Sequence, residues 1–177
     1  LTFQNNTIVA PAGAAVTLEM DTGKPLTTGS WSNNTYIKTN GSSTAFTIIT
    51  NGNGEAESFA GWQKATGLDL SSTFSATLPT TTKVVVEPNA YEAGRANILI
   101  YNWAKQGAVT VDLSKVLKSG DSYEVRNAQN FYGSPVTSGT YSGGAVSLPI
   151  VSVTAPTPIG GKTPASTGTT FVAYVVL

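Results

Sequence analysis

Carboxylates are the first residues in this sequence that could do chemistry. Glycoside hydrolysis needs two carboxyl groups that face each other across a sugar, about 5 to 9.5 Å apart. Glu19 with Asp21, and Glu55 with Glu57, would share a face in an extended chain. Because both pairs lie beside turn residues, we interpret them as solvated loop charges rather than as a catalytic pair.

Other catalytic and metal-binding arrangements find little support. The sequence has no His and no Cys, which removes Ser/His and Cys/His nucleophile systems and thiolate metal sites. Lys64 with Asp69 could form a lyase base beside a metal-bound acid, but Asp69 is as readily a turn cap. The stretch NGNGE, residues 51–55, supplies oxygen ligands but lacks the Asp alternation of a Ca²⁺ loop. We therefore expect no catalytic residues, no metal site, no cofactor and no enzymatic activity in this chain.

Charge and hydropathy restrict the partners. Ten basic and ten acidic residues cancel, so the chain has no basic footprint for nucleic acid. Charged residues make up only 11% of the sequence, and Thr, Ser, Asn and Gly, the residues of β-rich extracellular proteins, are abundant in their place. No apolar run reaches the about 18 residues of a membrane span. We expect a secreted or cell-surface protein without a membrane span or a nucleic-acid partner.

Aromatic residues beside amide side chains are the pattern that carbohydrate modules use, because rings stack on sugar faces while amides bind hydroxyls. The stretch NAQNFYGSP, residues 127–135, has this pattern. The candidate glycan-binding residues are Asn127, Gln129, Asn130, Phe131 and Tyr132, together with Tyr91 from another turn-rich segment. Phe131 and Tyr132 fit a core equally well, and Trp62 and Trp103 are better interpreted as core residues.

The phrase Asn-Asn-Thr occurs twice, in TFQNNTIV (2–9) and SWSNNTYI (30–37). A repeated phrase predicts stacked structural units in which amide side chains bond from one unit to the next and aromatic residues stack inside. The residues of this predicted repeat are Asn5, Asn6, Trp31, Asn33, Asn34 and Trp62. We expect Asn33 to bond to a neighbouring unit and Trp31 to lie inside or at the edge. Both copies, and residues 40–42, also fit the N-glycosylation pattern, and we favour stacking over modification.

Short runs of Val, Ile, Thr, Tyr and Phe between dense Gly, Asn and Pro turns predict an all-β fold. One helix is expected from Ser58, as N-cap, to Thr66, with Gly67 after its end and Phe59, Trp62 and Ala65 forming one apolar stripe. The composition changes near residues 78–83, which predicts two domains, 1–78 and 79–177. Strands of a small antiparallel β-sandwich are expected at residues 83–88, 96–103, 108–113, 122–127, 145–150 and 169–177. Residues 155–168 are expected to form a long exposed loop.

The first half of the chain resembles the last coils of bacterial right-handed parallel β-helix proteins. The resemblance rests on Trp31, Asn33, Asn34, Tyr36, Phe59, Trp62, Gln63, Thr66, Gly67 and Asp69. The second half resembles the β-sandwich that often follows such helices, on EPNAYEAGRANILIYNW, VDLSKVLKSGDSYEVRNAQNFYGSPV and TFVAYVVL. Members of this family carry many more coils upstream, and in its lyase-like enzymes the catalytic groove lies along them. Since the chain starts at Leu1, we expect a processed or excised piece without that groove.

Three functions stay open at this point. The first is a non-catalytic extracellular β-domain that binds glycan, caps and stabilises a β-helix, or does both. The second is a structural protein of the cell surface or of a filament, whose copies assemble through sheet edges, either at the open first coil or at the closing strand, residues 169–177. The third is the C-terminal fragment of a polysaccharide lyase or glycoside hydrolase.

Overall fold

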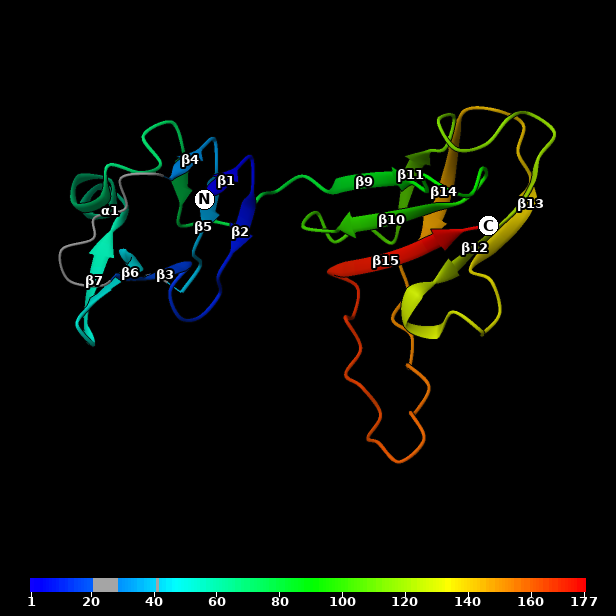
Figure 1. Ribbon diagram of the computed structural model, residues 1–177. Helices are drawn as coiled ribbons and strands as arrows, with labels where there is room; N and C mark the ends of the chain where they lie inside the picture. The colour runs from blue at the N-terminus through cyan, green and yellow to red at the C-terminus, as the bar shows by residue number, and fades with distance from the viewer. Residues whose placement is uncertain (21–28, 41) are drawn as a thin grey trace. The chain divides into compact units, whose positions relative to one another are not determined.

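The computed structural model describes residues 1–20, 29–40 and 42–177 of the chain. It divides into two compact units, Leu1–Leu78 and Pro79–Leu177, each of which is described by itself below (Figure 1). Strands dominate both units, and the described residues contain a single α-helix and a single 3₁₀ turn. The prediction of an all-β protein is confirmed.

The first unit is built from short strands that pair mostly in parallel. Its elements are β1 (Thr2–Gln4), β2 (Thr7–Val9), β3 (Val16–Met20), β4 (Ser30–Ser32), β5 (Thr35–Ile37), β6 (Thr44–Thr50), β7 (Asn53–Ser58), α1 (Phe59–Thr66) and β8 (Thr73–Ser75). β1 pairs with β4, β2 with β5, β5 with β8 and β3 with β6, all in parallel. The two Asn-Asn-Thr phrases therefore lie side by side, with Thr7 opposite Thr35.

These parallel pairs do not by themselves make a β-helix. The described strands of the unit form three separate small sheets, and β7 runs antiparallel to β6. No closed solenoid is formed within the described ranges, so the assignment to terminal β-helix coils stays a prediction.

Helix α1 has the caps that the sequence predicts. The Ser58 side chain accepts a hydrogen bond from the Gly61 N–H at 3.1 Å, and Gly67 adopts the left-handed conformation with φ of 69°. Trp62 is fully buried and stacks on Phe46 with ring centroids 5.2 Å apart. Ala65 is exposed, so the predicted apolar stripe is wrong at that position.

The second unit has two antiparallel sheets. The larger has the order β13-β12-β15-β10-β9 and the smaller pairs β11 with β14. The strands are β9 (Lys83–Pro88), β10 (Ala96–Tyr101), β11 (Ala108–Asp112), β12 (Ser122–Asn127), β13 (Thr137–Thr140), β14 (Ala145–Pro149) and β15 (Phe171–Val176); the 3₁₀ turn η1 (Ala128–Asn130) follows β12. All six predicted strands are present, and β13, which is short and polar, was missed.

Both sheets contribute to one hydrophobic core. Val109, Val111 and Leu113 are buried while Thr110 and Asp112 are exposed, as the alternation in the sequence predicts. Ile98 and Ile100 of β10, with Val172 and Tyr174 of β15, line the same core. Trp103 is only half-buried and stacks on Tyr101 outside this core, so its assignment as a core residue is wrong.

Strand β15 lies inside the larger sheet, between β12 and β10. Because β10 pairs with β15 along its whole length on one side and β12 pairs with Tyr174–Val176 on the other, β15 is not an edge strand, and the prediction that this closing strand offers a free edge for assembly is wrong. Between β14 and β15, residues 151–170 contain no strand and leave the sheets as a long excursion (Figure 1). All of residues 156–167 are exposed, as predicted for this loop, whereas Ala155 at its start is buried.

Candidate functional site

Asn34 links the two Asn-Asn-Thr phrases of the first unit. Its Oδ1 accepts hydrogen bonds from the backbone N–H of Asn6 at 3.0 Å and from the Asn6 side chain at 3.1 Å. Its Nδ2 donates to the Phe3 carbonyl and to Asp69, both at 2.9 Å. The Asn34 amide is buried with two donors and two acceptors in use, which is its full capacity. It therefore stabilises the stacking of the two phrases.

Asn33 does not make the inter-strand bonds expected of it. Its side chain is exposed and its φ is 55°, and Asn5 has the equivalent φ of 59°. The first Asn of each phrase thus supplies a left-handed turn, which Asn adopts more readily than most residues. The second Asn, by contrast, points inward. Trp31 is partly buried and packs between the rings of Phe3 and Trp62, with centroids 4.6 and 5.9 Å away.

Asp69 is the polar centre of the first unit. Its carboxylate is fully buried and accepts four hydrogen bonds, from Asn34 Nδ2 (2.9 Å), Ser72 Oγ (2.6 Å), Tyr36 Oη (2.8 Å) and Trp62 Nε1 (3.0 Å). These donors come from β5, from the residue before it, from α1 and from the turn before β8. Burial, together with the bond to this carboxylate, raises the pKa of Tyr36 well above its usual value.

These hydrogen bonds decide whether Lys64 and Asp69 can act as a lyase base beside a metal-bound acid. Every oxygen of the Asp69 carboxylate already accepts two bonds, and Lys64 is exposed at the end of α1. The two residues therefore do not form a base beside a metal-bound acid. Asp69 also closes the turn predicted for it, since its carbonyl accepts the Ser72 N–H at 2.9 Å.

The remaining carboxylates of the first unit form no site within the described residues. Glu19 lies on β3, and its predicted partner Asp21 lies outside the described residues. Glu55 and Glu57 lie on strand β7 rather than in a loop, and Glu55 is exposed. Asn51 and Gly52 form the tight turn between β6 and β7, both with positive φ. No group of three acidic residues that could hold a metal occurs in the described ranges.

In the second unit, the stretch predicted to bind glycan forms a loop, residues 128–136, which we call the Tyr132 loop. Asn127 is buried and its Oδ1 caps η1 by accepting the Gln129 N–H at 2.9 Å. Gln129 binds the long excursion, since its amide donates to the Ala165 carbonyl and accepts from the Thr167 N–H. Both amides therefore hold the loop in place and are not free to bind hydroxyl groups of a ligand.

Arg126 fixes the far side of the same loop. Its Nη1 donates to the carbonyls of Phe131 (3.1 Å) and Gly133 (2.7 Å), while Nη2 pairs with Glu124 at 2.6 Å. Tyr132 is 94% exposed, and the half-buried ring of Phe131 contacts it edge to face at 5.3 Å. The loop thus presents a solvent-facing aromatic ring on a backbone held by charge-assisted bonds.

Asn130 is the one amide of the stretch that stays available. Its side chain makes no hydrogen bond within the described part of the chain. It packs over Gly133, where an added Cβ would lie only 2.5 Å from Nδ2. Gly133 therefore allows the Asn130 amide to lie close to the backbone beside the aromatic pair.

Tyr91 does not join this group. It is 99% exposed in the turn between β9 and β10, where Asn89 Oδ1 accepts its N–H at 2.8 Å. The register places that turn beyond the Pro88–Ala96 pair, whereas β12 runs from Val125 toward Asn127 in the opposite direction along the sheet. Tyr91 and the Tyr132 loop thus lie at opposite ends of the strands.

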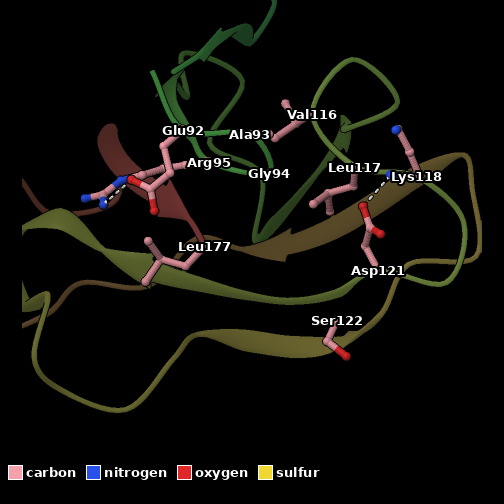
Figure 2. Close-up of a pocket in the computed structure, with 10 residues that line it drawn as sticks. All are labelled: Glu92, Ala93, Gly94, Arg95, Val116, Leu117, Lys118, Asp121, Ser122 and Leu177. Carbon is pink, nitrogen blue, oxygen red and sulfur yellow. Dashed lines mark hydrogen bonds and ion pairs between the residues drawn. The ribbon is translucent and has the colours of Figure 1, made fainter. Parts of the chain in front are cut away.

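A cavity of about 460 Å³ lies near the Tyr91 end of the sheet (Figure 2). Its lining comprises Glu92, Ala93, Gly94, Arg95, Val116, Leu117, Lys118, Asp121, Ser122 and Leu177. Of its charged groups, Arg95 pairs with Glu92 at 2.9 Å, and the Asp121 carboxylate accepts the Lys118 backbone N–H at 2.8 Å. The Lys118 ammonium points away from the Glu92–Arg95 pair (Figure 2). No set of catalytic groups converges in this cavity.

Three structurally important residues were not singled out from the sequence. Ser72 takes the place of the second Asn in a third, unrecognised copy of the phrase, since Thr73 pairs with Thr35. Lys38 is buried, and its ammonium donates to the Gly13 carbonyl. Arg126 could have been found from its position in β12 just before the aromatic stretch.

No helix in the described ranges is long and apolar enough to cross a membrane. Comparison with protein-family models, with curated proteins and with solved structures found no match to the chain.

Proposed function

We propose that the chain is a non-catalytic, secreted or cell-surface β-protein that binds glycan through the Tyr132 loop. In this proposal the first unit is the terminal part of a right-handed parallel β-helix and the second is an appended β-sandwich. The parallel pairing of equivalent phrases and the buried Asn34 support the first assignment. Two antiparallel sheets around one core support the second.

One observation carries the binding function: the Tyr132 ring is almost fully exposed on a loop that is fixed from both sides. Arg126 binds its backbone on one side and Gln129 ties it to the excursion on the other. Leaving a large aromatic ring in water gains nothing for folding, and a rigid ring loses little entropy when it stacks on a sugar. Asn130 supplies an adjacent amide for a hydroxyl group.

The experiment is binding of the full chain to a panel of plant and bacterial polysaccharides by affinity electrophoresis, followed by titration of any ligand found. Tyr132→Ala should weaken binding at least about tenfold, which corresponds to about 1.4 kcal/mol. Tyr91→Ala is the matched control, because Tyr91 is as exposed as Tyr132 but lies at the other end of the strands. Retention of no polysaccharide, or equal loss in the two variants, would refute this site.

A further inference from the structure

Strand β9 is an edge strand, and its sequence is self-complementary. Among the described strands it pairs with β10 alone, and Val84, Val85 and Val86 at its centre are only partly buried. Such an edge carries unpaired backbone groups beside apolar side chains, which is a template for another strand. The flanking residues, Lys83 and Glu87, carry opposite charges and are exposed.

One hydrogen bond in the turn after β9 shows which of its backbone groups face β10 and which face the free edge. Asn89 N–H donates to the Arg95 carbonyl at 2.8 Å, so this pair is a bonded one. Bonded pairs of an antiparallel ladder recur at every second residue, which directs the backbone of Lys83, Val85 and Glu87 toward β10. The N–H and C=O groups of Val84 and Val86 therefore point to the free edge.

We propose that this edge pairs with the same edge of a second copy of the chain, antiparallel, with the two-fold axis at Val85. In this register Val84 lies opposite Val86 of the second copy, in two bonded pairs that each exchange both N–H···O bonds. Val85 faces Val85 across the axis. Lys83 faces Glu87 of the second copy, and the symmetry repeats that pair, as an isologous interface requires.

Side-chain alternation supports the same register. Val84 and Val86 pack toward the core of the unit, so their cross-pairs would extend that core between copies. Lys83, Val85 and Glu87 share the other face, so two ion pairs would flank one Val–Val contact. The net charge of zero leaves no long-range repulsion between copies.

The other free edge of the larger sheet lacks these features. β13 reads Thr-Ser-Gly-Thr, with neither charge nor an apolar run. Pro88 has no N–H, so pairing at β9 cannot extend far beyond the valines. The contact is short, and we expect a weak dimer that depends on concentration and forms without any glycan.

Charge exchange tests the register. Sedimentation equilibrium of the full chain at low ionic strength, from micromolar to millimolar concentration, should show a monomer–dimer equilibrium. Lys83→Glu and Glu87→Lys should each raise the dimer dissociation constant at least about tenfold, since two cross-strand pairs become repulsive in each variant. An equimolar mixture of the two variants should recover association as a heterodimer. Lys162→Glu, an exposed site in the excursion, should leave the equilibrium unchanged.

Cysteine cross-linking tests the axis. The chain contains no Cys, so Val85→Cys places a single thiol at the symmetry axis. Opposed Cα atoms in a non-bonded antiparallel pair lie about 4.5 Å apart, within the range of a disulfide. Under mild oxidation this variant should form covalent dimers much faster than Ser138→Cys, its control on the β13 edge. A strictly monomeric chain at millimolar concentration, a dimer indifferent to both charge variants, or equal cross-linking of the two cysteine variants would overturn the proposal. None of these results depends on glycan binding, so the two proposals fail separately.

Discussion

Replacing Asp69 by Asn tests whether the buried carboxylate stabilises the first unit. Asp69 accepts four bonds, two of them from nitrogen groups that can only donate, Asn34 Nδ2 and Trp62 Nε1. These two donors bind different carboxylate oxygens, so either orientation of the amide introduced by the substitution would direct its NH₂ group at one of them. The hydroxyls of Tyr36 and Ser72 can rotate to accept a bond, but the indole and the Asn34 NH₂ cannot.

At least one buried nitrogen donor therefore loses its acceptor in Asp69→Asn and faces another donor in its place. An unsatisfied buried donor costs about 1–3 kcal/mol, and the introduced NH₂ group is left equally unsatisfied on that side, so we expect the free energy of unfolding of this unit to fall by about 3 kcal/mol. With a urea m-value of about 1–3 kcal/mol per molar, the midpoint should shift down by about 1–3 M. Urea titration followed by Trp fluorescence measures this, because Trp31 and Trp62 both lie in the first unit.

Asp112→Asn is the matched control, the same chemical change at the exposed end of β11, where the side chain accepts the Ser114 N–H. It should shift the midpoint only slightly. If Asp69→Asn unfolds within about 0.3 M of the wild type, the four bonds do not stabilise the unit as argued and the reasoning is refuted.

Three further predictions follow from the same contacts. Burial raises the pKa of Tyr36, so the neutral phenol stabilises the folded state fully below about pH 10, and this stabilisation is lost as the pH rises toward the folded-state pKa. In paired urea titrations above that pH, the free energy of unfolding should fall by up to about 1.4 kcal/mol per pH unit more in the wild type than in Tyr36→Phe. Asn34→Ala should cost about 2–4 kcal/mol by thermal or urea unfolding, and Asn33→Gly less than about 1 kcal/mol. Gln129→Ala should speed proteolytic cleavage within residues 156–167, measured by limited proteolysis with Asn130→Ala as control.

The sequence predicts the second unit well because its strands are long enough to show a period of two. Val109, Val111 and Leu113 reveal their buried face directly, and turn residues separate each strand from the next. β13 was not predicted because Thr137–Thr140 has no apolar alternation and is an edge strand held mainly by backbone bonds to β12. Trp103 was misassigned because residue type alone does not say which sheet face is covered.

In the candidate glycan site the sequence located the stretch but not the roles of its residues. Asn127, Gln129 and Asn130 all carry a side-chain amide. Asn127 nevertheless caps η1, Gln129 binds the excursion and Asn130 remains available. The bonds of Gln129 reach residues 165 and 167, which are far away in the sequence. Contacts of that separation depend on the tertiary fold and leave no local pattern.

The repeat of the first unit was also only partly predictable from the sequence. Thr7 pairs with Thr35 at a separation of 28 residues, but Thr35 pairs with Thr73 at a separation of 38. The extra residues of the second interval hold the antiparallel β6–β7 turn and α1, so a search at one fixed period cannot find the third copy. In that copy Ser72 and Asp69 replace the second Asn: Ser72 Oγ accepts the Asn34 N–H, and Asp69 accepts the Asn34 amide. The Asp69 carboxylate accepts bonds from Trp62 of α1 and from Tyr36 of β5. An Asn at this position would have to direct its own NH₂ group at one of the donors. The third copy therefore departs from the Asn-Asn-Thr sequence where a carboxylate is needed to bond α1 to β5.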